Sequence, residues 1–432
     1  MSFPKYPEYK DSGVEWLAEV PQNWDVKRLG YYFVERREKV SDVDYEPLSV
    51  TKMGIVPQLE TAAKTDDNDN RKKVCAGDFV INSRSDRKGS SGLSDRDGSV
   101  SLINTVLCPR EDILGIFAHH LFRSIPFQEE FYRYGKGIVA DLWSTNYSEM
   151  KSIVLAIPPL PEQSAIATVL DRETAKIDAL VAEQEKLIEL LKEKRQAVIS
   201  HAVTKGLDPN VPMKDSGVEW LGEVPEHWGL LTIGHASEFL SYGFTNPMPT
   251  TDIGPYMLTA NDIGYGYINY ENARSTSQEA LESLTDKSKP ISGDILITKD
   301  GTLGRVAIHD GKKCCINQSV AILRVTPEKL LPEFLATALL GSVYQEKMIF
   351  DAGGTTIKHI YISRLSKMLL AVPPIKEQYD ILKYLNYEVQ ASDQLIAESQ
   401  RAIDLLKERR SALISAAVTG KIDVRGLADA TQ

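Results

Sequence analysis

The fold is decided by residues 155–204, which read LAIPPLPEQSAIATVLDRETAKIDALVAEQEKLIELLKEKRQAVISHAVT. The same stretch recurs at residues 370–419 with 25 identities in 50 positions and no gap. In both copies a Pro-Pro pair is followed by Glu-Gln and by a long run without Gly or Pro. This run is rich in Ala, Leu, Glu, Lys and Arg, which are the strongest helix formers. The sequence therefore predicts two long helices, over residues 162–204 and 376–419.

Apolar residues recur along both predicted helices with heptad spacing, which is typical of a coiled coil. About 43 residues make a helix of roughly 65 Å, far longer than the average globular helix of about 11–12 residues. Neither helix can bury its apolar stripe alone, so we expect the two to pair, antiparallel and related by a pseudo-twofold axis. The stripe residues are Ile166, Leu170, Ile177, Leu180, Leu187, Leu191 and Val198, and then Ile381, Leu385, Leu395, Ala402, Leu406 and Leu413.

A second repeat precedes each variable part of the chain. Residues 10–30 and 214–234 share 13 identities in 21 positions, and four of the five tryptophans lie in these blocks. The blocks show neither helical nor strand periodicity, so we interpret their tryptophans as hydrophobic anchors. A block of this kind follows the first long helix but not the last one. We therefore expect the N-terminus to pack beside the end of the second long helix.

The repeats divide the chain into four parts. We expect an N-terminal recognition domain at residues 1–155 and the first long helix at 156–206. A C-terminal recognition domain follows at 207–370, and the second long helix with a tail at 371–432. Short β-rich runs between Gly-, Asn- and Asp-rich turns predict mixed α/β domains. The predicted fold class is thus α/β (α+β), with two mixed domains separated by two antiparallel coiled-coil helices.

Both variable regions contain a Gly-Asp turn that leads into an apolar strand and then a polar loop, at residues 77–92 and 293–305. Each is followed by an Ile-Asn pair that we expect to begin a further strand, at Ile103 and Ile316. Basic residues gather here, seven against three acidic ones both over residues 71–96 and over 287–324. Glycine-rich loops at residues 134–137 and 353–361 form a second candidate surface.

Such loops can present donors to DNA phosphates and base edges, where Arg reads guanine and Asn or Gln reads adenine. A charge cluster is more often a solvated face, so these windows alone do not establish DNA binding. The candidate DNA-binding residues are Arg84, Arg87, Lys88, Ser90, Ser91, Lys136, Trp143, Lys299, Thr302, Arg305, Asn317, Gln318, Thr355, Thr356, Lys358, His359 and Tyr361.

Composition excludes several classes of protein. The chain has 432 residues, 42% hydrophobic and 25% charged, and a net charge of −10, which excludes an intrinsically disordered chain and a wholly basic nucleic-acid coat. Four cysteines give neither a disulfide framework nor a metal-ligand spacing, and Cys314 and Cys315 are expected to be buried thiols. Without an apolar run long enough to span a membrane, we expect a soluble, cytoplasmic protein.

Catalytic motifs are scarce. The sequence has no P-loop, no dinucleotide-binding GxGxxG and no GxSxG. His119 and His120 lie in an apolar helical context without a neighbouring carboxylate in the sequence. We therefore expect no catalytic residue and no metal site, and favour a binding scaffold over an enzyme.

The alternation of these blocks resembles the specificity subunit of type I restriction–modification systems. The most specific marks are Pro158-Pro159 with Glu162-Gln163 and their copies, Pro373-Pro374 with Glu377-Gln378. The resemblance covers essentially the whole chain. It implies a non-catalytic subunit whose two variable regions are target-recognition domains, each reading one half of an asymmetric, bipartite site in double-stranded DNA. The long helices would set the gap between the half-sites.

The resemblance also implies partners and cofactors. Two modification subunits that carry S-adenosylmethionine, and two restriction subunits that need ATP and Mg²⁺, would dock on this chain, which would hold no cofactor itself. The alternatives are a self-contained DNA modification enzyme or nuclease with an unrecognised site, and a protein-interaction adaptor unrelated to DNA. Turnover of labelled S-adenosylmethionine, or DNA cleavage with Mg²⁺, by the purified chain alone would reject the scaffold hypothesis.

Overall fold

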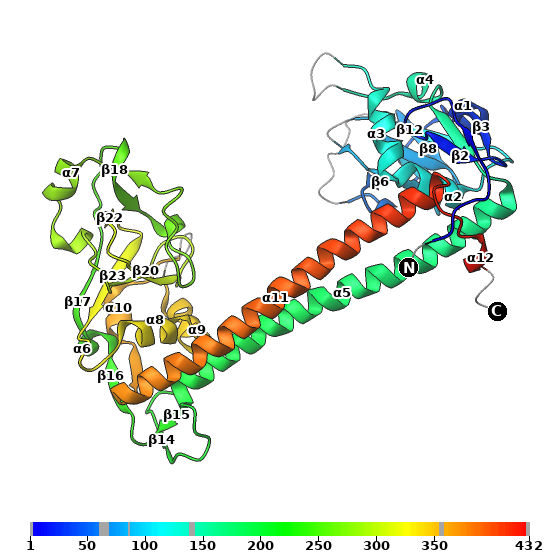
Figure 1. Ribbon diagram of the computed structural model, residues 1–432. Coiled ribbons are helices and arrows are strands. Elements are labelled where there is room, and N and C mark those ends of the chain that lie inside the picture. Colours follow the sequence, from blue (N-terminus) through cyan, green and yellow to red (C-terminus); the bar gives the residue numbers. More distant parts are fainter. Residues whose placement is uncertain (1–2, 60–68, 85–86, 138–142, 354–357, 429–432) are drawn as a thin grey trace. The chain divides into compact units, whose positions relative to one another are not determined.

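The computed structural model describes residues 3–59, 69–84, 87–137, 143–353 and 358–428 (Figure 1). Contacts divide the chain into two compact units. Unit 1 comprises Met1–Glu185 and Arg401–Gln432, and unit 2 comprises Lys186–Gln400. Helices α5 (Leu160–Lys205) and α11 (Ile375–Val418) each contribute to both units. The two long helices are confirmed, with ends within two residues of those expected.

Unit 1 is built around an antiparallel sheet with the strand order β10-β9-β12-β4. Helices α2 (Gly115–Arg123) and α3 (Ile125–Arg133) contribute Phe117, Phe122 and Phe127 to the same apolar core as Phe79 of β9. The sheet strands are β4 (Phe33–Glu35), β9 (Phe79–Asn82), β10 (Ser91–Leu93) and β12 (Asn104–Pro109). A second sheet has the order β11-β8-β5, formed by β5 (Lys39–Val40), β8 (Arg71–Val74) and β11 (Gly98–Val100), and β6 (Leu48–Thr51) pairs with β7 (Gly54–Pro57).

Unit 2 repeats this architecture with a different variable region. Its main sheet has the order β17-β23-β20-β21, so β20 takes the place of β9 and β23 the place of β12. The strands are β17 (Ser237–Tyr242), β20 (Ile295–Thr298), β21 (Val306–Ile308) and β23 (Val320–Val325). A smaller sheet joins β18 (Thr251–Leu258), β19 (Arg274–Ser275) and β22 (Cys314–Ile316). The helices include α6 (Ile233–Ala236), α7 (Gln278–Ser283), α8 (Pro332–Leu340), α9 (Ser342–Asp351) and α10 (Ile362–Lys367).

Helices α5 and α11 pack antiparallel within each unit. In unit 1, Arg410 binds Asp178 (Nε–Oδ1 2.8 Å), and Lys407 lies 4.0 Å from Glu185. Residue numbers decrease along α11 as they increase along α5, so the two helices are antiparallel. In unit 2, Arg195 binds Asp393 at 2.5 Å. The two Arg–Asp pairs are the same positions of the repeat, because Asp178 corresponds to Asp393 and Arg195 to Arg410. The pairing and the pseudo-twofold repeat are confirmed.

The heptad stripe is confirmed at its ends and wrong in its middle. Ile166, Leu170, Ile381 and Leu385 are at most 3% exposed, because each helix end is covered by a folded unit. Leu180, Leu187 and Leu395, which the spacing placed in the stripe, are 42–49% exposed. Ile188 and its copy Ile403 are buried in their place. In the middle of the pair the buried face is therefore displaced from the one that the heptad spacing predicted.

The Trp-containing blocks fold as small hairpins that the sequence did not reveal. Strands β1 (Tyr9–Asp11) and β2 (Glu19–Pro21) pair antiparallel in the first block, as do β14 (Met213–Asp215) and β15 (Glu223–Pro225) in the second. Each block then ends in a strand that pairs with the segment before the long helix, β3 (Asp25–Arg28) with β13 (Val154–Ile157) and β16 (Gly229–Thr232) with β24 (Leu369–Val372). Strands of three or four residues are too short to show a period of two.

The Glu of each Glu-Gln pair holds the second tryptophan of the neighbouring block. Glu162 is 6% exposed and accepts hydrogen bonds from Trp24 Nε1 (2.8 Å), Tyr6 Oη (2.6 Å) and Asn23 Nδ2 (2.8 Å). Glu377 accepts from Trp228 Nε1 (3.0 Å) and pairs with His227. The expected anchoring role of these two tryptophans is confirmed, and a buried carboxylate is part of each anchor.

The Gln of each pair closes the turn that precedes a helix. Gln163 accepts from the backbone N–H of Leu114 at 2.8 Å and donates to the Asp112 carbonyl, just before α2. Gln378 accepts from Leu331 at 2.8 Å and donates to the Lys329 carbonyl, just before α8. Both glutamines are fully buried. The motif therefore joins the long helix to its unit through polar contacts that an apolar residue cannot replace.

The N-terminus packs beside the end of α11, as expected from the order of the blocks. Lys421 donates to the carbonyls of Leu17 (2.8 Å) and Glu19 (2.9 Å), and the Asp423 backbone N–H donates to Pro4. In unit 2, Lys205 makes the matching contact with the Glu223 carbonyl. The end of each long helix is thus covered by one of the two blocks.

Candidate nucleic-acid interface

The structure brings the two candidate surfaces of unit 1 together. Arg84, which follows β9, forms a β-bridge with Ser144, and Ser144 also bridges Lys136 through two backbone hydrogen bonds of 2.9 and 3.0 Å. The Thr145 N–H donates to the Ser83 carbonyl at 3.0 Å. Two segments separated by more than 50 residues therefore form one edge, which we call loop pair 1 and define by residues 82–84 and 136–145 as far as the structure describes them.

Charged side chains project from and beside loop pair 1. Arg84, Arg87, Lys88 and Lys136 are exposed, and the Lys88 ammonium lies 5.3 Å from the ring centroid of Tyr132. Trp143 is half-buried and donates from Nε1 to the Tyr132 carbonyl at 3.0 Å. Ser90 and Ser91, also candidates, are 7% and 1% exposed and lie within the unit.

Unit 2 has an equivalent loop pair with different chemistry. Asp300, which follows β20, forms a β-bridge with His359, and His359 forms a second β-bridge with Gly353. The Ile360 N–H donates to the Lys299 carbonyl at 2.9 Å. The Asp300 carboxylate also binds His359 Nδ1. We call these segments, residues 298–300 and 353–361 as far as described, loop pair 2.

The candidate residues of unit 2 have unequal access to solvent. Lys358 and Gln318 are exposed and Tyr361 is 42% exposed, with its ring 4.7 Å from that of His359. Lys299 is only 4% exposed, forms an ion pair with Asp300 at 3.0 Å, and lies over the ring of Tyr242. Thr355 and Thr356 lie outside the described residues.

The remaining candidates of unit 2 line the turn after β20. Thr302 is exposed, and its carbonyl accepts from Thr298 Oγ1 at 2.5 Å. Arg305 is half-buried and donates to the Ile263 carbonyl at 3.2 Å. Asn317 follows β22, where its Oδ1 accepts from Ser319, so the Ile316-Asn317 pair ends a strand. The expectation that it begins one is wrong, whereas Asn104 does begin β12.

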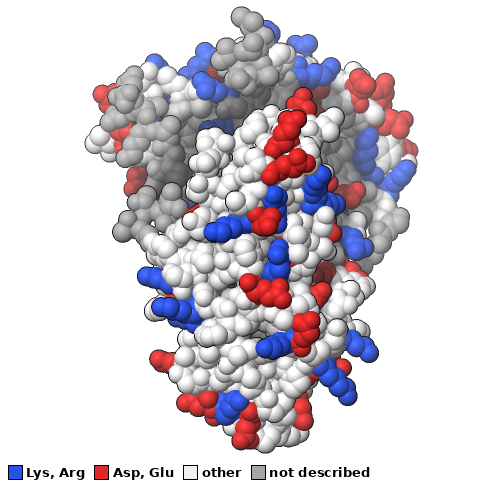
Figure 2. All heavy atoms as spheres, turned by 90° about the vertical axis from the view of Figure 1, so that its left-hand side faces the viewer, with Lys and Arg blue, Asp and Glu red and all other residues white. Residues whose placement is uncertain are grey.

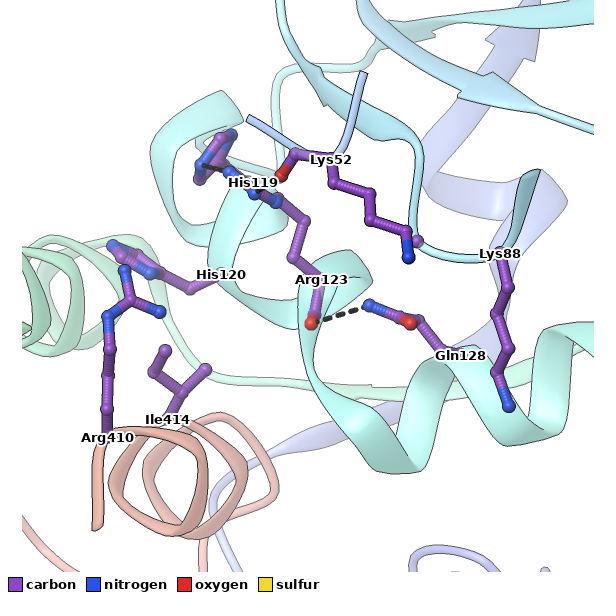
Figure 3. A pocket seen from close by; sticks show the side chains of 9 residues that line it. Lys52, Lys88, His119, His120, Arg123, Gln128, Arg410 and Ile414 are labelled. Atoms are coloured by element: carbon purple, nitrogen blue, oxygen red, sulfur yellow. Dashed lines mark hydrogen bonds between the residues drawn. The ribbon is translucent and has the colours of Figure 1, made fainter. Parts of the chain in front are cut away.

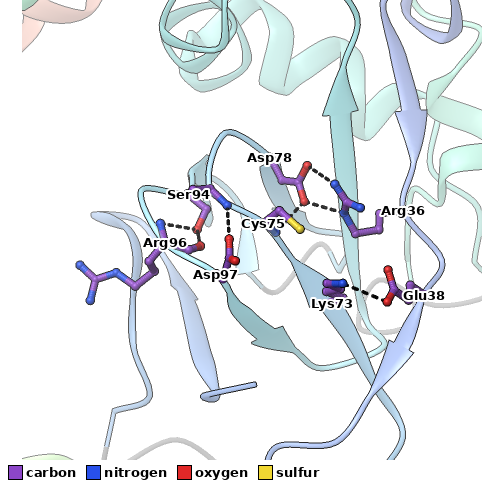
Figure 4. A network of polar contacts seen from close by, with 9 residues as sticks. Arg36, Glu38, Lys73, Cys75, Asp78, Ser94, Arg96 and Asp97 are labelled. Atoms are coloured by element: carbon purple, nitrogen blue, oxygen red, sulfur yellow. Dashed lines mark hydrogen bonds and ion pairs between the residues drawn. The ribbon is translucent and has the colours of Figure 1, made fainter. Parts of the chain in front are cut away.

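Intramolecular pairs account for much of the basic charge in the two windows. Lys73 binds Glu38 (Figure 4). Lys72 binds Glu35, and Arg96 pairs with the adjacent Asp95. On the face shown in Figure 2, basic and acidic side chains are interspersed over broad uncharged areas. Net charge per window therefore overstates what is available to a nucleic acid.

The Asp of each Gly-Asp turn is a structural residue. Asp78 is 3% exposed and receives two hydrogen bonds from Arg36, of 2.7 and 3.0 Å (Figure 4). Asp294 is fully buried and receives two from Arg324, of 2.7 and 2.8 Å. These hydrogen bonds raise the pKa of both arginines. The paired, buried carboxylates hold the start of β9 and β20, the strands that carry the loop pairs.

Sequence reasoning missed a contact of His120. Its Nε2 lies 2.8 Å from Asp171 Oδ1 of α5, although no carboxylate is near it in the sequence. Only helix packing brings the two together. No group of three or more His, Cys, Asp or Glu side chains that could hold a metal ion occurs among the described residues. None of the described helices combines the length and apolar character that a bilayer crossing demands.

Comparison with known proteins identifies this arrangement. Residues 246–403 match the family model of the type I restriction modification DNA specificity domain. The chain is 23% identical over 442 residues to the putative type I restriction enzyme MjaX specificity subunit of Methanocaldococcus jannaschii, covering 95% of this chain and 96% of that protein. The chain is similar, over nearly its whole length, to the specificity subunits of type I restriction–modification systems. Members of this family are DNA-recognition subunits.

Other similarities agree with this assignment. The type I restriction enzyme EcoBI specificity subunit of Escherichia coli is 26% identical over 289 residues, which is 65% of this chain but only 60% of that protein. The HsdS subunit from Thermoanaerobacter tengcongensis has a TM-score of 0.56 at 18% identity, over 93% of this chain and 98% of that one. A chain from a structural study of type I complex assembly and conformational transition reaches 0.72 at 17%, over 92% and 98%. At these identities the solved structures show a shared fold.

Proposed function

We propose that this specificity subunit reads an asymmetric, two-part DNA target, with one half-site recognised by each variable region. One observation carries the proposal: the same loop pair occurs at the same place in both units, with different side chains. Arg84 of unit 1 occupies the position of Asp300 in unit 2, and Lys136 occupies the position of Gly353. A matched scaffold with unmatched loops favours two different half-sites read in opposite orientation about the pseudo-dyad.

The exposed side chains suit base and phosphate contacts of different kinds. In unit 1, the Arg84 and Arg87 guanidinium groups can donate two hydrogen bonds to a guanine edge, and Lys136 can neutralise a phosphate. In unit 2, Gln318 can pair with adenine, and Lys358 and Tyr361 flank His359. Lys299, by contrast, would reach DNA only if its buried ion pair with Asp300 opened.

We assign DNA reading to residues 1–155 and 207–370, and spacing to the helical segments 156–206 and 371–432. The acidic balance of the chain, net −10, favours weak DNA binding by the subunit alone, with modification subunits supplying part of the phosphate neutralisation. S-adenosylmethionine, ATP and Mg²⁺ would then be held by the two modification and two restriction subunits.

Exposed leucines on the long helices support docking of two equal partners. Leu180 and its copy Leu395 are 46% and 49% exposed, and Leu190 and its copy Leu405 are 51% and 65% exposed. Each unit therefore displays one leucine from each pair. Exposed apolar residues at repeated positions are typical of protein interfaces, and repeated positions would present the same contact twice.

Docking is tested by Leu190→Glu and Leu405→Glu made separately, with Leu59→Glu as the control. Leu59 is 48% exposed and belongs to the variable region of unit 1, not to a long helix. Each helix variant should reduce the modification subunits in the purified complex from two to one, measured by native mass spectrometry. Two subunits retained in both variants would reject these leucines as the docking surface.

The recognition assignment is tested by Arg84→Ala and Lys358→Ala in the assembled complex. Arg84→Ala should relax or abolish recognition of one half-site, and Lys358→Ala should affect the other, with methylated adenines mapped across a genome. A loss of one good base contact costs about 1–3 kcal/mol, roughly 10- to 100-fold in binding. Arg37→Ala, a 75% exposed arginine outside the loop pairs, is the control. Normal target methylation by both variants would refute the assignment.

The spacer role is tested by inserting one heptad into each long helix. Seven residues add about 10 Å of helix, so the gap between half-sites should lengthen while the half-sites stay the same. An unchanged gap in the mapped methylation sites would reject this role.

A further inference from the structure

A basic cavity of about 420 Å³ lies in unit 1 between α2, the end of α11 and two loops of the variable region (Figure 3). Four of its lining residues are cationic, namely Lys52, Lys88, Arg123 and Arg410. Among the lining residues that the structure describes, none is Asp or Glu. In Figure 3, Arg410 rises from α11 toward His120, and the backbone carbonyl of Arg123 accepts from Gln128 Nε2 (2.8 Å). The cavity therefore gathers positive charge from four separate parts of the chain.

The nearest carboxylates neutralise only part of this charge, because Asp178 pairs with Arg410 alone among the four cations. Asp178 binds Arg410 at 2.8 Å, and Asp171 binds His120 at 2.8 Å. Within the described part of the chain, no salt bridge joins Arg123, Lys52 or Lys88 to an acid. Burial, followed by the positive charge of the nearby Arg410, lowers the pKa of Arg123.

Arg123 also lacks a well-matched acceptor on His119. His119 Nδ1 accepts from the Leu93 backbone N–H at 3.2 Å, while its Nε2 lies 3.0 Å from Arg123 Nη1. Burial, followed by the charge of Arg123, lowers the pKa of His119 to about 4, so the ring is neutral near pH 7. A neutral imidazole has only one acceptor nitrogen. If Nδ1 accepts from Leu93, Nε2 carries the proton, and Arg123 Nη1 faces another donor.

Unit 2 provides an internal comparison. Its cavity of about 400 Å³ is lined by Arg195 and Ile199, the copies of Arg410 and Ile414. Gln163 and Gln378 bind Leu114 and Leu331, which aligns α2 with α8 and places Thr337 and Leu340 where unit 1 has His120 and Arg123. The other lining residues include leucines, Val389 and Asp393, and Arg195 is the only Lys or Arg among those the structure describes. The scaffold therefore does not require the basic lining, which is specific to unit 1.

We propose that the cavity of unit 1 binds an oxyanion of the phosphate class, held by Arg123 and Arg410 with Lys52 and Lys88 beside them. Planar guanidinium groups match the geometry of phosphate oxygens and bind them bidentately. Arg123 Nη2 already donates to the Lys52 carbonyl, so the oxyanion supplies an acceptor for Nη1, which faces His119. Its source is either free phosphate or a phosphodiester of bound DNA, and Lys88 belongs to the same loop as the exposed Arg87.

The first arm of the test uses the free chain and inorganic phosphate in a phosphate-free buffer. Isothermal titration should show saturable binding that weakens at least tenfold in Arg123→Leu, which installs the residue found at the equivalent place in unit 2. Arg37→Leu, which removes an exposed charge outside the cavity, should bind phosphate as the original chain does. If Arg123→Leu misfolds by circular dichroism, the variant Lys52→Gln with Lys88→Gln takes its place.

The second arm uses the assembled complex and target DNA. If the cavity holds a DNA phosphate, Arg123→Leu removes one phosphate contact. The slope of log K for DNA binding against log salt concentration should then fall in magnitude by about 0.9, while the methylated sequence stays the same. Phosphate binding with an unaltered slope assigns the cavity to free phosphate, and a reduced slope assigns it to DNA. An unaltered slope without phosphate binding overturns the proposal. Phosphate binding by a chain whose complex fails to select a target would leave the cavity intact and refute only the proposed recognition function.

Discussion

Replacing Glu162 by Ala should destabilise unit 1 through two orphaned donors. Glu162 is 6% exposed, and its carboxylate is the acceptor for Trp24 Nε1 and Tyr6 Oη, whose residues are 0% and 4% exposed. Leaving a buried donor without a partner costs about 1–3 kcal/mol. Two such donors give about 2–6 kcal/mol. The third partner, Asn23, is exposed and can bond to water instead.

The repeat supplies the matched control. Glu377 makes the equivalent bond to Trp228, but its second partner is the exposed His227. Glu377→Ala therefore orphans one buried donor and should cost about 1–3 kcal/mol, half as much as Glu162→Ala. Adding Tyr6→Phe to Glu162→Ala removes one of the orphaned donors and should recover about 1 kcal/mol.

Hydrogen exchange under native conditions measures these effects separately in each unit. Amides of β2 and β3 report on unit 1, and those of β15 and β16 report on unit 2. We expect Glu162→Ala to lower the opening free energy of the first set and Glu377→Ala that of the second. A change below about 0.5 kcal/mol in Glu162→Ala, or a larger effect of Glu377→Ala, would refute the argument that buried donors determine the cost.

Three further predictions follow from the same contacts. The pair of Arg410 with Asp178 is half-exposed on both sides, so a double-mutant cycle should give a coupling energy of about 0.2–1 kcal/mol that falls with salt. Burial, and then Asp78, raises the pKa of Cys108 to about 11, so its alkylation by iodoacetamide should be slow at pH 8 and rise about tenfold per pH unit. Because the pKa of His119 is lowered to about 4 by burial, the unfolded chain binds more protons between pH 6.5 and 4. Unit 1 should thus lose about 2–3 kcal/mol across this range, and His119→Gln should lessen the loss measured by urea unfolding.

Much of the fold could be predicted from the sequence because the chain contains two internal repeats, which mark equivalent structural elements. The 25 identities in residues 155–204 and 370–419 identified two long helices. A Trp block follows the first long helix but not the second, and this order predicted that the N-terminus packs at the end of α11. Helix propensity and the spacing of apolar residues are local properties of the chain, so the long helices can be predicted from the sequence alone. The loops after β9 and β20 were also found, since a Gly-Asp turn before an apolar run is a local signal.

Tertiary structure decided which of those residues face solvent and which meet each other. Leu180 is exposed and Ile188 is buried although both lie in one helix, because helix packing selects the buried face. Arg84 and Asp300 occupy equivalent positions after β9 and β20, yet Arg84 is exposed, whereas the Asp300 carboxylate is paired with Lys299 and His359. The cavity of Arg123 and Arg410 joins residues nearly 290 positions apart. Contacts between segments far apart in the chain produce no regular pattern in the sequence, so only the tertiary structure shows them.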